Sequence, residues 1–561
     1  MYKSALTLIF ATSLSACGGS ENNETATGVI DNVTEIVEVV DVTPTLDHSG
    51  LTPLTREVID NSEYFSGGEA STTASNKDAF SIQPPAIASD FQLGANFTLG
   101  DHIFRTPDDN IGPILITGSC QGCHLNDGRG VVPATPTTPM SSMLIKLADS
   151  TGAADPIYGD QIQPFSVQSF SGDDFTAGYS QHDGSVSGTE LLGEAFPFVE
   201  FEIITGEYPD GTPYQLRKPT YKIRDLSYGA FVDDIHFSAR VAPQAFGVGL
   251  LGAIPQENLL NLVDESDRDK DGISGRASMV TDAVLGDDTA DKVIGRFAYK
   301  AQNPSVLQQV SSAFGGDMGL STSVFSHEPC TDLQLACLLA TEKESKVEDI
   351  VDISDYSLAL VEFYNRVLSV PVRRGYDTNT ATWDTDISAG RTLFFEANCV
   401  GCHTPRHVTG EAKGSVLGEL SLTRLSDDAE PITVLSQQTI YPYTDLLLHD
   451  MGGSCEVTRE TTQGLSCSSG AECLYVQRCE GLADGVIQGD ASGSEWKTPA
   501  LWGLGLVQTV NADSSFLHDG RARTIEEAVL WHDGEAATAK AMFMNYSADE
   551  RQQLLLFLQS L

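Results

Sequence analysis

The sequence predicts a mainly α-helical fold, built from two related modules with long loop-rich stretches and short β-hairpins inserted between their helices. The motif C-x-x-C-H occurs twice, at residues 120–124 and 399–403. A G-x-x-x-F spacing precedes each motif, at residues 100–104 and 390–394. This repeated order indicates two modules of common design within one chain.

Each C-x-x-C-H motif is typical of covalent attachment of c-type haem. Its two thiols can add across the two vinyl groups of one porphyrin, and the adjacent histidine becomes the proximal ligand of the iron. A zinc site or a redox-active C-x-x-C is the alternative, but a histidine beside the second cysteine in both motifs favours haem. The predicted attachment residues are Cys120, Cys123, Cys399 and Cys402, and the predicted proximal ligands are His124 and His403.

The two modules are expected to be cytochrome-c-like, because such domains place a short amphipathic helix directly before the motif. We expect an N-terminal haem domain with an insertion over residues 91–370, and a C-terminal haem domain over residues 371–561. A length of 561 residues leaves room for both. The predicted cofactors are two covalently bound haem c groups.

The formal charge of −45 argues against binding to nucleic acid and against adhesion to anionic lipid by charge. It favours a basic docking partner or simple solubility in salty water. The hydrophobic fraction of 41% is ordinary for a soluble protein.

The N-terminus has the features of a secretory signal peptide over residues 1–16, with Lys3 followed by an apolar run too short to span a membrane. It ends in L-S-A-C, which resembles a bacterial lipobox and implies lipidation of Cys17. Gly18 follows in place of aspartate, which favours an outer-membrane anchor facing the periplasm of a Gram-negative bacterium. Residues 17–90 are then a lipidated, flexible tether of polar composition. The alternative is plain secretion.

The six remaining cysteines are even in number and lie in polar loops, as expected for disulfides in an oxidising compartment. Cys330 with Cys337 is the simplest pair. The connectivity of the other four stays open at this point: Cys455, Cys467, Cys473 and Cys479.

A D-x-D-x-D-G run at residues 267–272 is a candidate calcium loop, since alternate carboxylates at a turn offer hard oxygen ligands. Its ligands would be Asp267, Asp269 and Asp271. Ser278 stands where an EF-hand has glutamate, so the loop would be of another type. A solvated acidic turn is the alternative.

The order of motifs after the second C-x-x-C-H resembles the C-terminal half of bacterial di-haem cytochrome c peroxidases and of the enzymes that mature methylamine dehydrogenase. T-P-x-L-x-G-L stands at residues 498–504, and F-x-H-D-G-x-x-x-T-x-E-E-A-V at residues 516–529. The closer resemblance is to the di-haem oxidoreductase family, once labelled thiol oxidoreductases. It rests on G-R-F at residues 295–297, D-M-G at 317–319 and H-D-M-G at 449–452.

The resemblance implies a second axial ligand for the C-terminal haem. In the peroxidases this ligand lies fourteen residues after the histidine of the H-D-G-like turn, and counting from His518 reaches His532. Ligation by His532 would give a lower reduction potential than a histidine and methionine pair. His518 itself is the second candidate ligand, with a structural role as its alternative.

The N-terminal haem departs from the peroxidase pattern, because Met140 stands at the position of the family's distal histidine. Either Met140 or Met143 ligates the iron, or the distal side is open, as peroxide binding requires. Core packing is the common alternative for methionine. The resemblance also implies Gln161 and Glu194 as general acid-base groups, with ordinary polar roles as the alternative.

The function implied is that of a periplasmic, peroxidase-like di-haem c-type oxidoreductase. Hydrogen peroxide would be reduced, or used as an oxidant, at the N-terminal haem. Electrons from a small cytochrome c or cupredoxin would be relayed by the C-terminal haem. The alternative is a non-catalytic di-haem electron-transfer protein. A thiol oxidase is less favoured, because the surplus cysteines look structural.

Overall fold

A computed structural model describes residues 59–107, 111–167, 191–284, 292–343, 351–412, 431–461, 467–468 and 470–561. These residues belong to one compact unit. The predicted signal peptide and Cys17 lie outside the described residues. Among the helices described, none has the length and apolar character needed to cross a membrane.

The fold is not mainly α, and that prediction, with its two cytochrome-c-like domains, is wrong. Only 30% of the chain is helical and 21% is strand, distributed over many small sheets. The stretches predicted as loops and short hairpins are rich in aromatic and β-branched residues with period-two alternation. Such residues pack well on a pleated surface, so these stretches form strands, two of them twelve residues long.

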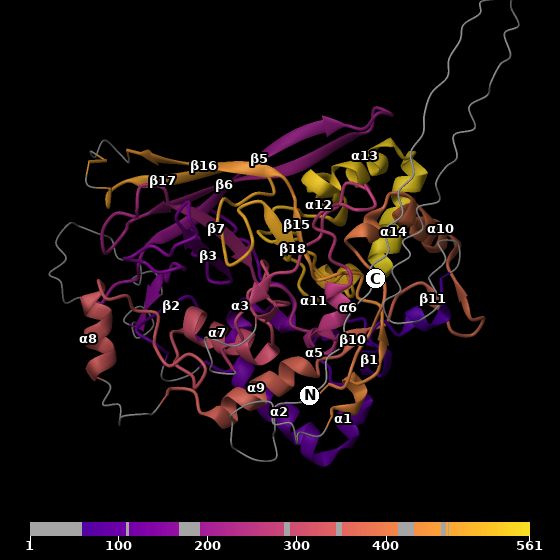
Figure 1. Cartoon of the computed structure of the whole chain (residues 1–561), viewed down its shortest axis with the longest axis horizontal. Helices are drawn as coiled ribbons and strands as arrows, with labels where there is room; N and C mark the ends of the chain where they lie inside the picture. The colour runs from indigo at the N-terminus through magenta and orange to yellow at the C-terminus, as the bar shows by residue number, and fades with distance from the viewer. Residues whose placement is uncertain are drawn as a thin grey trace, which may run out of the picture. The chain divides into compact units, whose positions relative to one another are not determined.

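Two helix pairs pack apart from the largest sheet, one at the bottom and one at the right of the view in Figure 1. In the first, α2 (Phe91–Arg105) packs against α9 (Asp355–Arg366). In the second, α10 (Thr385–Glu396) packs against α14 (Ala548–Ser560). Each pair contains the helix that precedes one C-x-x-C-H motif.

A glycine allows the close approach within each helix pair. A Cβ atom at Gly100 of α2 would collide with the carbonyl oxygen of Leu360 in α9. At Gly390 of α10 it would collide with the carbonyl oxygen of Gln553 in α14. The glycine of the G-x-x-x-F repeat therefore has the same packing role in both modules.

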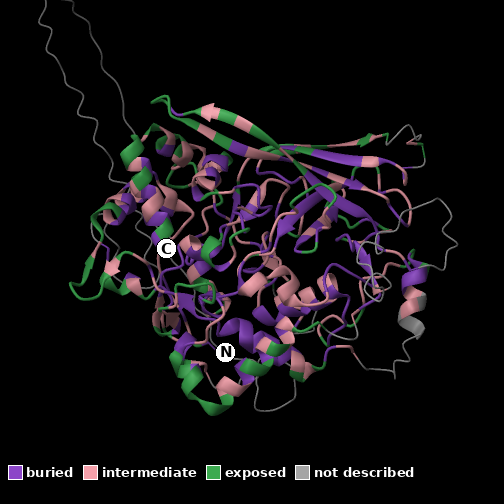
Figure 2. Ribbon diagram, turned by 180° about the vertical axis from the view of Figure 1, so that it is seen from behind, coloured by how far each residue is buried: buried purple, intermediate pink, exposed green. Residues whose placement is uncertain are grey.

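The largest sheet has four antiparallel strands in the order β16-β17-β6-β5 (Figure 1). They are β16 (Gly453–Glu460), β17 (Leu474–Gly481), β6 (Pro213–Arg224) and β5 (Phe196–Glu207). Because β17 pairs with β6, the insertions of both halves of the chain form one sheet. The far end of the β5–β6 hairpin is exposed, as Figure 2 shows.

A second antiparallel pair joins β3 (Met143–Ala148) to β7 (His236–Val241). Alternate residues of both strands point into an apolar cluster, among them Ile145 and Phe237. The remaining helices are α1 (Pro85–Ser89), α3 (Cys120–Cys123), α5 (Val248–Gly252), α6 (Gln256–Leu260), α7 (Val306–Met318), α8 (Leu335–Lys343), α11 (Val507–Val510), α12 (Ile525–Trp531) and α13 (Ala537–Asn545).

The other strands are short. They are β1 (Ser71–Thr72), β2 (Ile114–Leu115), β4 (Phe165–Ser166), β8 (Met279–Val280), β9 (Val293–Ile294), β10 (Val370–Pro371), β11 (Tyr376–Asp377), β12 (Thr382–Trp383), β13 (His407–Val408), β14 (Thr439–Ile440), β15 (Leu448–Asp450) and β18 (Glu495–Lys497). They pair two by two, apart from the sheets already described.

Part of the range predicted as a tether is folded into the unit. β1 pairs in parallel with β10. Glu63 is fully buried, and it forms ion pairs with Arg373 at 2.5 Å and Arg391 at 3.1 Å. The polar composition of this segment suggested a tether, but its buried charge is compensated by cations from distant parts of the chain.

Three disulfides form among the six cysteines that remain when the haem motifs and Cys17 are set aside. The predicted pair Cys330–Cys337 is confirmed. The pairing that the sequence left open is Cys455–Cys479, across register partners of β16 and β17, and Cys467–Cys473.

Candidate functional site

The first C-x-x-C-H motif forms the short helix α3, and His124 follows directly. Nδ1 of His124 lies 2.7 Å from the carbonyl oxygen of Pro243, so Nδ1–H donates to it. The ring of Phe104, from the preceding helix, lies 6.0 Å from the imidazole, measured between ring centroids. This arrangement fixes the tautomer in which Nε2 keeps its lone pair for a metal.

The second motif repeats this arrangement. Cys399–Gly401 form a 3-10 turn, and Nδ1 of His403 donates to the carbonyl oxygen of Tyr443 at 3.0 Å. The ring of Phe394 lies 6.3 Å from the imidazole. Both predicted proximal ligands are therefore oriented by a backbone carbonyl and flanked by the phenylalanine of the G-x-x-x-F repeat.

The protonation states of both motifs suit haem attachment. Burial lowers the pKa of His124, and lowers that of His403 to about 4, so both rings are neutral at pH 7, as a metal ligand must be. Burial raises the pKa of Cys120 and of Cys399 to about 12. The four motif cysteines are free thiols, and within the described ranges they are the only free ones.

The zinc alternative has no support in the geometry. In the part of the chain that the structure describes, neither motif gathers three metal-ligating side chains within reach of one ion. Free thiols beside an oriented, neutral imidazole fit covalent haem.

His532 is close enough to the second motif to affect the pKa of His403, and a hydrogen bond orients its ring. Its Nδ1–H donates to the carbonyl oxygen of Ala528 at 2.7 Å, which leaves Nε2 free. Burial lowers the pKa of His532. Burial also lowers the pKa of His403, and the nearby imidazoles of His532 and His449 lower it further. Among the described residues, no second imidazole lowers the pKa of His124. The two motifs therefore differ in their surroundings, and ligation by His532 stays a prediction.

His518, the second candidate ligand, stacks on Trp496 with ring centroids 3.7 Å apart and an interplanar angle of 15°. Its Nε2 lies 3.8 Å from Oδ2 of Asp519. Burial lowers its pKa to about 4. The ring is thus held between an indole and a carboxylate, and ligation of the iron by His518 stays a prediction.

Met140 and Met143 are each 1% exposed and belong to the apolar cluster formed by β3 and β7. The neighbouring residue Ser141 lies next to the first motif, since Sγ of Cys123 is 3.6 Å from its carbonyl oxygen. Ligation of the iron by either thioether stays a prediction.

Gln161 and Glu194 are both buried and already hydrogen-bonded. Nε2 of Gln161 donates to Oδ1 of Asp317 at 2.9 Å. The carboxylate of Glu194 accepts bonds from the backbone N–H of Gln163 and the side chain of Gln334. Burial raises the pKa of Glu194 well above its usual value. Their assignment to acid-base chemistry stays a prediction.

The sequence reading did not assign a role to Asp317, although D-M-G was noted as a signature. Burial raises the pKa of Asp317, and its charge raises the pKa of both Cys120 and Cys123. Its carbonyl oxygen also accepts from the N–H of Ile116 at 2.8 Å, close to the start of the motif. A buried carboxyl bonded to Gln161 therefore lies near the first pair of thiols.

Tyr299, Trp496 and His518 form a cluster of three aromatic rings. Tyr299 and Trp496 are 6.3 Å apart, and His518 is 6.4 Å from Tyr299. The hydroxyl of Tyr299 donates to the carbonyl oxygen of Val241, two residues before the carbonyl that binds His124.

The same cluster is tied to the second motif. Trp496 is followed closely by Thr498, whose carbonyl oxygen accepts from Oγ1 of Thr444 at 2.7 Å. Thr444 follows Tyr443, which binds His403. The aromatic cluster thus connects the segments that orient the two proximal histidines.

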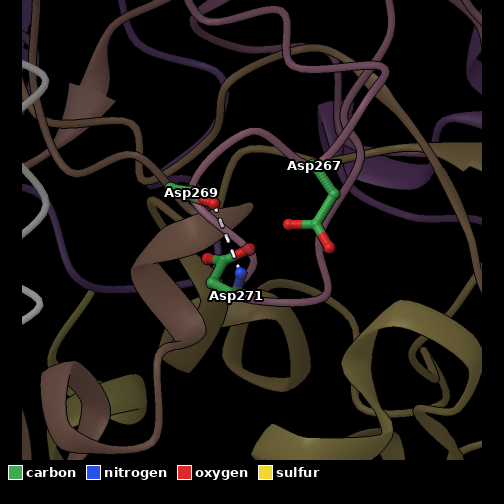
Figure 3. A group of neighbouring side chains, drawn as sticks. All are labelled: Asp267, Asp269 and Asp271. Atoms are coloured by element: carbon green, nitrogen blue, oxygen red, sulfur yellow. Dashed lines mark hydrogen bonds between the residues drawn. The ribbon is translucent and has the colours of Figure 1, made fainter. Parts of the chain in front are cut away.

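The acidic loop brings its three carboxylates together, as Figure 3 shows. One oxygen from each of Asp267, Asp269 and Asp271 lies within 4.8 Å of the others. The N–H of Asp271 donates to Oδ1 of Asp269 at 3.3 Å. Asn398, directly before the second motif, donates to Oδ2 of Asp271 at 2.9 Å. The loop is therefore attached to the motif, and calcium binding is not shown.

A family model described as "Di-haem oxidoreductase, putative peroxidase" matches residues 64–464 and 469–561. No curated protein matches the chain. Among solved structures, hydrazine synthase of Kuenenia stuttgartiensis, pressurised with xenon, is similar at 15% identity and a TM-score of 0.21. The aligned region covers 42% of this chain and 63% of the hydrazine synthase chain, which is less than two thirds of that chain. We draw no conclusion about fold or function from this similarity.

The family match includes both C-x-x-C-H motifs and confirms the resemblance stated from the sequence. It implies two haem groups and an oxidoreductase activity. The chain belongs to the di-haem oxidoreductase family.

Proposed function

We propose that the protein is a di-haem c-type oxidoreductase that reduces hydrogen peroxide, or uses it as an oxidant, at the haem held by Cys120 and Cys123. Electrons reach it through the haem held by Cys399 and Cys402. The observation that carries this proposal is the difference between the two motifs. Near His403 lies the buried imidazole of His532, whose Nδ1–H donates to the carbonyl oxygen of Ala528, whereas among the described residues no imidazole affects the pKa of His124.

The difference matters because a catalytic iron needs an open position, while an electron-transfer iron is filled on both sides. When bound, the haem supplies the one-electron redox steps and the iron site for peroxide. Reduction of one peroxide to two waters consumes two electrons and two protons. The chain must therefore supply protons near the first motif.

Two buried carboxyls support the proton supply, and one of them, Asp317, lies near the first motif. Burial raises the pKa of Glu194 well above its usual value and also raises that of Asp317, which favours the protonated form of both carboxyls. Gln161 hydrogen-bonds Asp317 and orients its carboxyl. We assign Glu194 and Gln161 to proton handling as part of this proposal.

The aromatic cluster of Tyr299, Trp496 and His518 supports electron transfer between the haems. It connects the segments that orient His124 and His403 through packed rings and backbone hydrogen bonds.

The location and partners belong to the same proposal. The lipobox-like L-S-A-C implies an outer-membrane lipoprotein facing the periplasm, and the charge of −45 suits a basic small cytochrome c or cupredoxin as electron donor. Mutation of Cys17→Ser should move the protein from the membrane fraction to the soluble fraction. We also propose calcium binding at Asp267, Asp269 and Asp271, supported by the convergence of their oxygens.

A peroxide titration of the fully reduced protein tests the proposal. We expect one equivalent of hydrogen peroxide to oxidise both haems, since each gives one electron. A pyridine haemochrome assay on the same sample should give two haems per chain, retained after denaturation. If both haems stay reduced under excess peroxide, the protein is the non-catalytic electron carrier instead.

A further inference from the structure

His449 occupies a fixed position beside the second haem-attachment motif. Its side chain is 3% exposed, and its Nδ1 lies 3.5 Å from Sγ of Cys402. In c-type attachment Sγ is the atom bonded to the porphyrin edge. The imidazole of His449 is therefore in contact with the atom that joins the haem to the chain.

Two carboxylates hold this imidazole. Nε2–H donates to Oδ2 of Asp445 at 2.8 Å, and Nδ1–H donates to Oε2 of Glu535 at 2.7 Å. An imidazole that donates from both nitrogens is protonated and carries a positive charge. Burial alone would lower the pKa of His449, whereas the charge of Asp445 and its hydrogen bond to the ring raise it.

The charged ring has little freedom to move. A Cβ atom at Gly275 would lie 2.9 Å from Cε1 of His449, so the backbone packs directly on the ring. Glu535 is itself held by Oγ of Ser274 at 2.6 Å. The N–H of Asp445 donates to the carbonyl oxygen of Cys402 at 3.1 Å. The carboxylates are thus fixed to the same scaffold as the motif.

We propose that His449 is a positioning residue that raises the reduction potential of the C-terminal haem, by holding a positive charge against the edge at which Cys402 attaches. The inference rests on the proposed function, because it needs a haem at Cys402. A positive charge near the haem favours the ferrous over the ferric state.

The neighbouring carboxylates oppose this effect, but they bind the imidazole and not the sulfur atom. Among the described charged side chains, His449 is the one within hydrogen-bonding distance of Sγ of Cys402, at 3.5 Å.

A redox titration of the protein with both haems bound, followed by its visible spectrum, tests the inference. His449→Gln should lower the midpoint potential of one haem by at least about 59 mV, a tenfold change in its one-electron equilibrium. Glu535→Gln should raise the same midpoint, because it removes a negative charge while Asp445 still holds the imidazolium. The midpoint of the other haem should stay unchanged in both variants.

The opposite signs distinguish a charge effect from structural damage, which has no reason to follow the sign of the charge removed. His407→Gln is the matched control, since His407 is a buried histidine whose Nε2 lies 2.7 Å from the carbonyl oxygen of Thr444. It should leave both midpoints in place.

Midpoints that do not move, or that move in the same direction in both variants, overturn the inference. If the His449→Gln protein loses a haem, the Glu535→Gln protein alone tests the inference. An upward shift of its midpoint potential supports the inference, and an unchanged midpoint potential overturns it. A wild-type protein with two haems that does not react with peroxide would contradict the proposed peroxide reduction and leave the role of His449 standing.

Discussion

Tyr443 donates a hydrogen bond from its hydroxyl to Oε2 of Glu63 at 2.8 Å. The carbonyl oxygen of the same tyrosine accepts from Nδ1 of His403. A carboxylate from the N-terminal segment is therefore one residue removed from the predicted proximal ligand of the second haem. At the first motif Tyr364 also donates its hydroxyl to a buried carboxylate, Oδ1 of Asp127 at 2.7 Å, but the carbonyl that binds His124 belongs to Pro243.

The first prediction follows from the burial of Glu63 between Arg373 and Arg391. Glu63→Gln should lower the free energy of unfolding by about 3–5 kcal/mol, because it leaves two buried cations without a full counter-charge. Denaturant unfolding measures this change. Glu69→Gln, at an exposed position of the same segment, should change it by less than about 0.5 kcal/mol. Equal stabilities of the two variants would show that the N-terminal segment is not part of the folded unit.

The second prediction concerns acid stability. Burial raises the pKa of Glu495, but hydrogen bonds from Arg276 and Ser492 outweigh it and hold the pKa at about 2. A carboxyl with a lowered pKa stabilises the fold above its unfolded value near 4.5, and this contribution is lost as pH falls toward 2. It amounts to about 3 kcal/mol at most.

Glu495→Gln should therefore reduce stability at pH 6 and flatten the decline between pH 4.5 and pH 2. Unfolding measured at several pH values checks this. Glu480→Gln removes an exposed partner of Lys218 and serves as the control, with a pH profile like that of the wild type. If the free energy of unfolding of the Glu495→Gln protein still falls steeply between pH 4.5 and pH 2, other carboxyls are responsible for the acid sensitivity.

The third prediction assigns His532 to the C-terminal haem. His532→Gly should convert this haem from low to high spin, and His532→Met should raise its potential, as expected for thioether ligation. His518→Gly should instead cost stability, because its ring stacks on Trp496. Absorption and magnetic spectra of the ferric protein report the spin states. If His518→Gly alone changes the spin state, the two histidines have exchanged roles.

The fourth prediction is that the acidic loop binds calcium. Chelation should lower the melting temperature, because a ligand bound only to the folded state stabilises it. Asp269→Ala should abolish the difference between chelated and calcium-loaded protein, whereas Asp282→Ala, outside the loop, should keep it. If chelator does not change the melting temperature, the loop is a solvated turn that binds no calcium.

The sequence was sufficient for features that depend on local spacing. The C-x-x-C-H motifs, the glycine and phenylalanine of the preceding helices, and the pair Cys330–Cys337 all involve residues close together in the chain. Features that join distant segments were missed. The pairing of Tyr475 with Ile223 makes one sheet from two insertions. The residue pattern of a strand predicts that it is a strand, but not which distant strand it pairs with. Local patterns therefore led to a mainly α prediction.

The candidate site divides in the same way. His124 and His403 follow from their motifs, and His532 follows from a family spacing. Asp317 and His449 are recognised only once the fold places them beside the cysteines of a motif. Asp317 belongs to the D-M-G signature and His449 to the H-D-M-G signature, so the sequence pointed to both segments. It did not indicate which residues these two side chains contact.

The most direct test of the central claim is the spin state of the two haems in the oxidised protein. Electron paramagnetic resonance at low temperature should show one high-spin and one low-spin ferric haem per chain, and hydrogen peroxide should remove the high-spin signal. Two low-spin haems that do not respond to peroxide would contradict an open iron at the N-terminal motif and the proposed peroxide reduction with it.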